Sequence, residues 1–180
     1  ATNTSAIAFH TMATGVTGSS AKLLQFANVD ARLYGIDADF GYHLNDFWHV
    51  DGAVSDVKGE RRDNGGNLYR IAPANARLGL THQRKNWSAT LETSAYLEKD
   101  DVSGVTNELE TAGYALLNIY GNYNIPKSGL TFVAGIDNLF DKNYAPHLGG
   151  VNRVRGVDVP AGVRVPGPGI NGYINLVYKW

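Results

Sequence analysis

The sequence has no cysteine, a single methionine and no strong excess of charge of either sign. Its 180 residues carry 16 Lys and Arg against 17 Asp and Glu, a net charge of -1. The absence of cysteine excludes a disulfide framework and a thiolate metal site, and the balanced charge gives no electrostatic basis for binding nucleic acid. No apolar run reaches the roughly 18 residues of a membrane helix. The chain begins without a methionine or an apolar leader, which we interpret as a mature or truncated chain.

What the sequence has instead is tyrosine, glycine and alternation. It contains 10 tyrosines and 21 glycines, and nearly every segment alternates apolar with polar residues. This period of two is the pattern of a β-strand with two different faces. It predicts an all-β fold of eight strands without a helix. The expected strands are 5–13, 31–44, 47–57, 75–83, 87–98, 114–123, 130–138 and 172–180.

The connections between these strands alternate between tight turns and long loops. The tight turns are expected at 45–46, 84–86 and 126–129, and the long loops at 14–27, 58–74, 99–112 and 141–169. Outer-membrane β-barrels have this asymmetry, with short periplasmic turns and longer extracellular loops. The pattern therefore favours a transmembrane antiparallel up-and-down β-barrel, with both ends of the chain on the periplasmic side.

The less polar face of each strand is expected to face lipid, because a charge at mid-depth in hydrocarbon costs about 2–4 kcal/mol. On this assignment few cations besides Lys179 point into the lumen. Arg32 and Asp56 fall on the lipid face, but at strand ends, where they reach the headgroups. A soluble ligand-binding β-barrel with its apolar face inside fits the alternation equally well, and this alternative stays open. The acidic residues expected in the lumen are Asp37, Asp39, Asp51, Glu92 and Asp137.

The C-terminal part of the sequence resembles the end of a TonB-dependent outer-membrane receptor. The motif Asn-Leu-Phe-Asp-Lys-Asn-Tyr at 138–144 is followed by a long loop and a last strand that ends in an aromatic residue, Trp180. Receptors of this family commonly close in this way. Segments 28–39 and 70–80 resemble two further recurring pieces of the barrel, so the resemblance covers most of residues 28–180.

The resemblance implies that residues 1–180 are the C-terminal portion of a larger barrel of about 22 strands. The plug domain, the energy-coupling box and the first strands are not in this sequence. It also implies the outer membrane of a Gram-negative bacterium, with lipid, lipopolysaccharide, the plug and TonB as partners. The implied function is uptake of a metal or metal chelate, either siderophore-iron or copper. The alternative is a self-contained eight-stranded outer-membrane barrel with a structural or adhesive role.

No enzyme and no cofactor are expected, apart from a transported metal or metal chelate. Serine, histidine and aspartate occur, but without the strand-turn-helix setting of a nucleophile elbow. The glycine-rich stretch at 149–172 is followed by no Lys-Ser/Thr pair and no helix, so it is not a phosphate-binding loop.

His10, Met12 and His147 are the candidate metal ligands. Residues 10 and 12 point to the same face of one strand, near its outer end, and imidazole with thioether suits copper better than iron. His147 opens an outer loop and follows the tyrosine of the closing motif, as in the copper-receptor branch of the family. The alternative is that all three are ordinary polar or space-filling side chains.

Three arginines of the longest loop are candidates for binding an anionic metal chelate. Arg153, Arg155 and Arg164 lie among glycines and prolines, and guanidinium groups bind carboxylates in a bidentate manner. A solvated loop that pairs with lipopolysaccharide phosphates explains them equally well.

Overall fold

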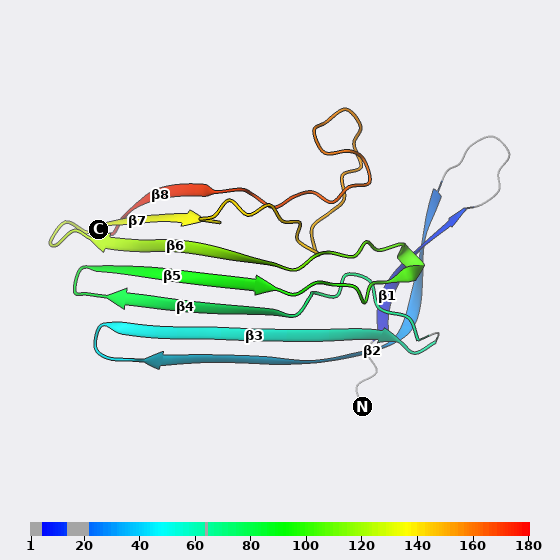
Figure 1. The fold of residues 1–180 in the computed structure, drawn as a ribbon, viewed down its shortest axis with the longest axis horizontal. Coiled ribbons are helices and arrows are strands. Elements are labelled where there is room, and N and C mark those ends of the chain that lie inside the picture. Colours follow the sequence, from blue (N-terminus) through cyan, green and yellow to red (C-terminus); the bar gives the residue numbers. More distant parts are fainter. Residues whose placement is uncertain (1–4, 14–21, 64) are drawn as a thin grey trace.

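The computed structural model describes the backbone of residues 5–13, 22–63 and 65–180, and side chains from residue 28 onward. It is an antiparallel sheet of eight strands in sequence order (Figure 1). The strands are β1 (Ser5–Ala13), β2 (Lys22–His43), β3 (Trp48–Arg61), β4 (Asn75–Gln83), β5 (Trp87–Tyr96), β6 (Tyr114–Asn124), β7 (Leu130–Asp137) and β8 (Asn171–Tyr178). One 3₁₀ turn, η1 (Gly104–Thr106), lies between β5 and β6. Within these described ranges, no helix is long and apolar enough to cross a membrane.

All eight predicted strands are present, but β2 and β3 are longer than predicted. β2 begins at Lys22 rather than at residue 31, and β3 continues to Arg61 rather than ending at 57. The alternation that marks a half-buried strand fades in these segments, yet each has a complete partner: 22–30 pairs with β1, and 58–61 pairs with 31–34. Beyond the hydrocarbon a strand needs no apolar face, so composition alone understates its length. Residues 14–21 of the expected loop 14–27 lie outside the described part.

β2 carries two partners end to end. β1 pairs along Lys22–Asp30, and β3 pairs along the rest of β2 as far as His43. Ser5 pairs with Asp30, which lies at the end of the sheet that carries the long loops. From Ser5, β1 runs away from the tight turns. The first described residue therefore lies at the long-loop end of the sheet, whereas the C-terminus lies at the tight-turn end (Figure 1). The prediction that both ends share one side is wrong, because β2 is long enough for β1 to pair beyond β3.

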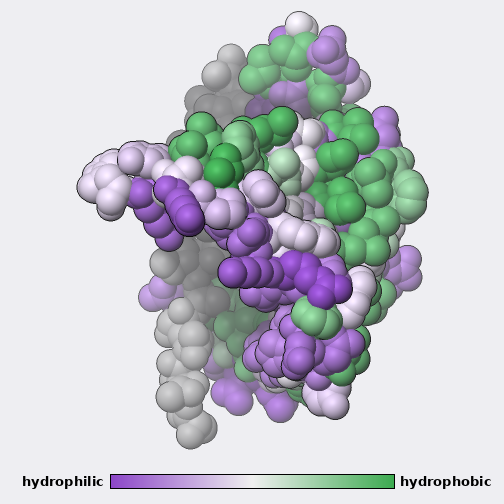
Figure 2. Space-filling view, turned by 90° about the vertical axis from the view of Figure 1, so that its left-hand side faces the viewer, coloured by the Kyte–Doolittle hydropathy of each residue, from purple (hydrophilic) through white to green (hydrophobic). Residues whose placement is uncertain are grey.

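The strand register keeps the two faces separate across the sheet. One apolar row runs through Tyr42, Val50, Leu80, Leu91, Ile119 and Ile136, each paired with the next. A slip of one residue would have turned a strand's whole apolar set to the other face. Leu91 is 42% exposed, whereas the neighbouring Glu92 side chain on the opposite face is 16% exposed. The apolar face is therefore the open one, and Figure 2 shows hydrophobic residues gathered along one side of the sheet. A soluble barrel would require the reverse arrangement.

Aromatic rings border the apolar face at the tight turns. The ring of His82 lies 4.4 Å from Trp48 and 5.1 Å from Trp87, measured between centroids. The Arg84 guanidinium lies 3.7 Å from the ring centroid of Phe47. Amphipathic rings at this height are typical of the girdles that mark a membrane interface.

At the opposite border the apolar face carries charge. Arg32 lies over the Tyr34 ring at 5.0 Å, and the Tyr34 hydroxyl donates a 2.7 Å hydrogen bond to Glu60. Arg32 and Asp56 were expected at strand ends and instead lie within the longer β2 and β3. Both are still beyond the level at which β4 begins, because the β3–β4 ladder ends at Ser55. Their charges therefore lie at the outer border of the sheet.

The sheet is open, with β1 and β8 as its edges. In the part of the chain that the structure describes, no ladder joins these two strands. The described strands therefore do not close into a barrel among themselves. At the level of the apolar face, the free edges are those of β8 and of residues 31–43 of β2, which pair with β3 alone. Since unpaired edge groups in hydrocarbon each cost several kcal/mol, these two edges require partners in a membrane.

Candidate functional site

A charged network lies on the inner, polar face of β3, β4 and β5. The Arg77 guanidinium lies 3.1 Å from Asp51 and 3.2 Å from Glu92. Glu92 also accepts hydrogen bonds from the Tyr120 hydroxyl at 3.2 Å and from the Asn118 amide at 3.3 Å. One cation thus balances two carboxylates, and neutral polar donors reach both oxygens of Glu92.

The register brings these groups together. Gly79 of β4 pairs with both Asp51 and Glu92, while Arg77 is two residues further along the same face. A Cβ at position 79 would lie 2.9 Å from an oxygen of the Asp51 carboxylate. The glycine therefore leaves the space into which Asp51 leans toward Arg77.

Arg77 corrects the expectation that Lys179 has few cationic companions in the lumen. Its position was readable from the sequence, because residue 77 alternates with the apolar Ala76 and Leu78. Asp37 and Asp39 line a cleft of about 300 Å³ together with Arg77. The inner wall therefore carries a cation among its acidic residues.

The closing motif forms the neck of the longest loop. Asn138 is 2% exposed and has a left-handed backbone, with φ of 50°. Its amide donates to the carbonyls of Lys142 at 2.9 Å and Pro168 at 3.1 Å, and its carbonyl oxygen accepts from Lys142 N–H at 2.8 Å. Asp141, with φ of 49°, accepts from Ile170 N–H at 2.9 Å. The motif residues thus hold the start of the loop to its end.

Glu108 connects three long loops. Its carboxylate accepts the backbone N–H of Arg70 at 2.9 Å and of Ser103 at 3.0 Å. The same carboxylate lies 3.3 Å from the His147 ring, and both side chains are almost fully buried, at 4% and 1% exposure. Loops 62–74, 97–113 and 138–170 are therefore fastened together at one carboxylate.

His147 packs inside this junction. Its Nδ1 and the Thr111 hydroxyl share a 2.9 Å hydrogen bond, while Nε2 faces Glu108 without hydrogen-bond geometry. Burial lowers the pKa of His147 below its ordinary 6.5, and the neighbouring Glu108 charge opposes that shift only in part. A neutral imidazole with one nitrogen engaged and the other beside a carboxylate stabilises the loops. No group of three or more candidate ligands is found among the described residues.

The three candidate arginines lie in two different settings. Arg164 is partly buried and donates to the carbonyls of His147 at 2.7 Å, Gly149 at 3.5 Å and Leu109. Arg153 and Arg155 are exposed near the tip of the same loop. Arg164 therefore holds loops together, while the other two are free to meet a ligand from outside.

His10 and Met12 are located only by their backbone. They pair with Gln25 and Leu23 in the hairpin of β1 and β2, and their side chains lie outside the described residues. β1 lies beside η1 (Figure 1), which belongs to the loop that also carries Glu108 and Thr111. The structure thus brings the strand of His10 and Met12 close to the loop against which His147 packs.

Residues 2–139 match the family described as TonB dependent receptor-like, beta-barrel. The chain belongs to this family. TonB-dependent receptors are outer-membrane transporters of Gram-negative bacteria rather than enzymes, which confirms the predicted fold class and location. The match ends ahead of most of the closing unit, although that unit carried the clearest resemblance in the sequence.

Solved structures of a transporter and of import receptors share the fold over most of this chain. The copper transporter OprC is similar, at 28% identity and a TM-score of 0.84, over 97% of this chain and 26% of its own. A mutant of the ferric enterobactin receptor PfeA from Pseudomonas aeruginosa matches at 21% identity and a TM-score of 0.62, over 97% and 26%. The ferric-catecholate import receptor Fiu of E. coli K12 matches at 16% and 0.59, over 84% and 21%.

The chain spans about a quarter of the length of the first of these receptors. No relative is found among curated proteins. The low identities to PfeA and Fiu support the fold alone, whereas the likeness to OprC is closer in both sequence and structure.

Proposed function

We propose that residues 1–180 form the C-terminal portion of the barrel of a TonB-dependent receptor that takes up copper across the outer membrane. The observation that supports copper most is the likeness to the copper transporter OprC, which exceeds that to PfeA in both identity and TM-score. In this proposal the open edges of β2 and β8 pair with the remaining strands, and the inner wall surrounds a plug domain. Energy comes from TonB through the plug.

The chemistry of the candidate ligands favours the same metal. Thioether sulfur is a soft donor that selects cuprous copper, and imidazole accepts copper in either state. His10 and Met12 supply one of each, on a strand beside the loop that packs on His147. His147 uses one ring nitrogen for its hydrogen bond with Thr111. We therefore propose that His147 stabilises the loops at the outer opening of the barrel and that His10 and Met12 bind the copper.

Metal analysis of the complete receptor tests this proposal. The receptor is purified in detergent, incubated with Cu(I), and its bound copper measured by mass spectrometry. We expect the double variant His10→Ala/Met12→Ala to lose bound copper and copper uptake. The matched control His43→Ala removes a histidine at the far end of the wall and is expected to retain both. Uptake that persists in cells lacking TonB, or variants that bind copper as the wild type does, would contradict the proposal.

A siderophore receptor is the second candidate, supported by the exposed pair Arg153 and Arg155. Guanidinium groups at the mouth would bind an anionic ferric chelate. If this candidate is correct, Arg153→Gln/Arg155→Gln lowers uptake of the iron chelate, and loss of His10 and Met12 has no effect on it.

A further inference from the structure

The apolar face of the sheet contains a trench that runs across the strands near the tight turns. Its floor is a row of small residues, Ala89, Gly121 and Ala134, each paired with the next across β5, β6 and β7. The hollow has a volume of about 910 Å³. Ile174 of β8 pairs with Ala134 and closes one end.

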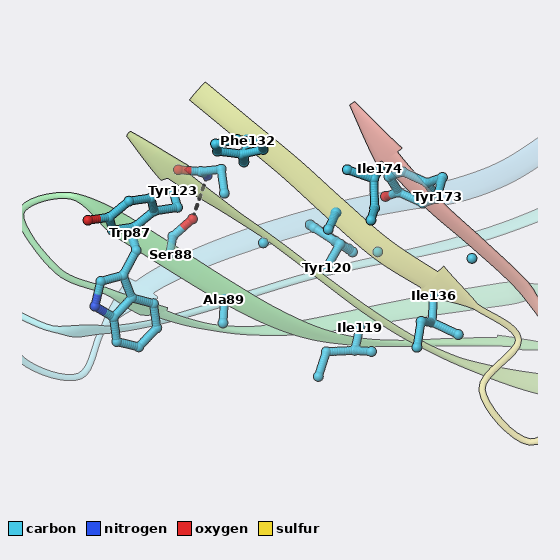
Figure 3. Close-up of a pocket in the computed structure, with 15 residues that line it drawn as sticks. Trp87, Ser88, Ala89, Ile119, Tyr120, Tyr123, Phe132, Ile136, Tyr173 and Ile174 are labelled. Carbon is cyan, nitrogen blue, oxygen red and sulfur yellow. Dashed lines mark hydrogen bonds between the residues drawn. The ribbon is translucent and has the colours of Figure 1, made fainter. Parts of the chain in front are cut away.

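The trench has two unlike walls. Trp87, Tyr123 and Phe132 form one wall, two residues nearer the tight turns than the floor. Ile119 and Ile136 form part of the other wall, on the long-loop side. Figure 3 shows the three aromatic residues grouped toward the turns, with the two isoleucines on the opposite side. The floor row spans two strand spacings and is about 10 Å long, a third of the roughly 30 Å hydrocarbon core.

The floor is fixed by the backbone. A Cβ at Gly121 would lie 2.4 Å from the Ser88 carbonyl oxygen, so this position admits no side chain while β5 and β6 remain paired. The centre of the trench therefore stays open to a group from outside the chain.

The polar surroundings are cationic on the side of the trench that faces the periplasm, beyond the aromatic wall. The turn between β4 and β5 carries Arg84 and Lys85, both exposed, next to the Trp87 wall. Arg84 also donates from Nε to His82 at 3.2 Å, so the side chain is held at the border of the apolar face. The adjoining turn contributes Lys127, and no acidic residue lines the trench.

We propose that this trench binds an anionic phospholipid of the periplasmic leaflet, with one acyl chain along the Ala89–Ala134 row and the phosphate beside Arg84 and Lys85. The apolar face meets lipid because the chain is an outer-membrane barrel segment. The tight turns face the periplasm in such barrels, and this places the cationic border at the inner leaflet. The site is independent of which substrate the receptor transports.

Native mass spectrometry of the complete receptor, extracted with phosphatidylglycerol and phosphatidylethanolamine in equal amounts, tests the proposal. We expect retained phosphatidylglycerol in the wild type, and about tenfold less in Ala89→Leu/Ala134→Leu, because the added side chains occupy the apolar trench. Arg84→Gln/Lys85→Gln should lose the preference for the anionic lipid. The matched control Ala115→Leu adds the same bulk elsewhere on the apolar face and should retain lipid as the wild type does.

Photo-cross-linking measures lipid contact directly, without leucine side chains that fill the trench. Benzoylphenylalanine in place of Phe132 should capture phosphatidylglycerol. Phe40 is an exposed ring on the same face outside the trench, and benzoylphenylalanine at that position should capture little. Equal capture at both positions overturns the proposal. Capture of lipopolysaccharide or of a second receptor copy at Phe132, or equal lipid retention by all variants, also overturns it.

Discussion

Arg77 and Glu92 face each other across the β4–β5 ladder, with 3.2 Å between guanidinium nitrogen and carboxylate oxygen, and the same guanidinium reaches Asp51 at 3.1 Å. Removing the cation leaves two carboxylates on one wall without their shared partner. We predict that Arg77→Met destabilises the folded receptor by about 1 kcal/mol, a modest loss because the arginine is partly exposed. Urea unfolding measures it, and a double-mutant cycle with Glu92→Gln isolates the pair. A loss no larger than that of the exposed-site control Arg153→Met would show that the network contributes nothing.

Asn138 holds the neck of the longest loop, so its replacement should open that loop. Asn138→Ala removes the hydrogen bonds to Lys142 and Pro168. It also places alanine, whose side chain forms no hydrogen bond, in the left-handed backbone region at φ of 50°. We expect a loss of about 2–4 kcal/mol and faster protease cleavage within 138–170. Asn143→Ala is the matched control, since that asparagine is exposed. Equal cleavage of both variants would contradict the assigned role.

The loop junction should loosen in acid. Because burial lowers the folded-state pKa of His147 below 6.5, the unfolded or open state takes up a proton first as pH falls. The junction is therefore fully stable above pH 6.5 and loses stability progressively below it. Hydrogen exchange of residues 138–170 should accelerate below that pH in the wild type and much less in His147→Gln. Acceleration of the same size in the variant would assign the effect to another group.

The two faces of β7 should respond oppositely to charge. Ile136→Arg, on the apolar row farther from the turns, places a cation against lipid at a cost of about 2–4 kcal/mol at mid-depth and should prevent stable insertion. Thr131→Arg, on the inner face of the same strand, should be tolerated. Asn118 would be a poor inner-face control, because it accepts the Asn138 N–H at 2.9 Å and donates to Glu92. The heat-resistant migration of folded barrels on gels measures insertion, and equal tolerance would invalidate the facing assignment.

The strands and their faces could be predicted because alternation and register depend on each other. Once Leu91 and Ile119 must share the lipid face, only registers of one parity remain for β5 and β6. The tight turns also predicted which end of each strand faces the periplasm. The full length of β2 could not be predicted in this way, since its first nine residues are held by pairing with β1 rather than by an apolar face.

The roles of the loop residues were less accessible to sequence reasoning. Nothing local in the sequence distinguishes Arg164, which bonds carbonyls of two loops, from the exposed Arg153. The burial of His147 depends on Glu108 and Thr111, about 40 residues earlier in the chain. Asn138 and Asp141 belong to a motif that sequence comparison can find, but their hydrogen bonds to the far end of the loop required the structure.

The central claim is that this sheet is part of the wall of an outer-membrane receptor, with one face in lipid. Spin labels introduced singly at residues 130–137 of the complete receptor in native membranes test it most directly, since this chain has no cysteine of its own. The account predicts a period of two: labels at Phe132, Ala134 and Ile136 accessible to oxygen in the bilayer, and labels at Thr131, Val133 and Gly135 accessible to a water-soluble relaxant. The opposite phase, or no alternation along the strand, would contradict it.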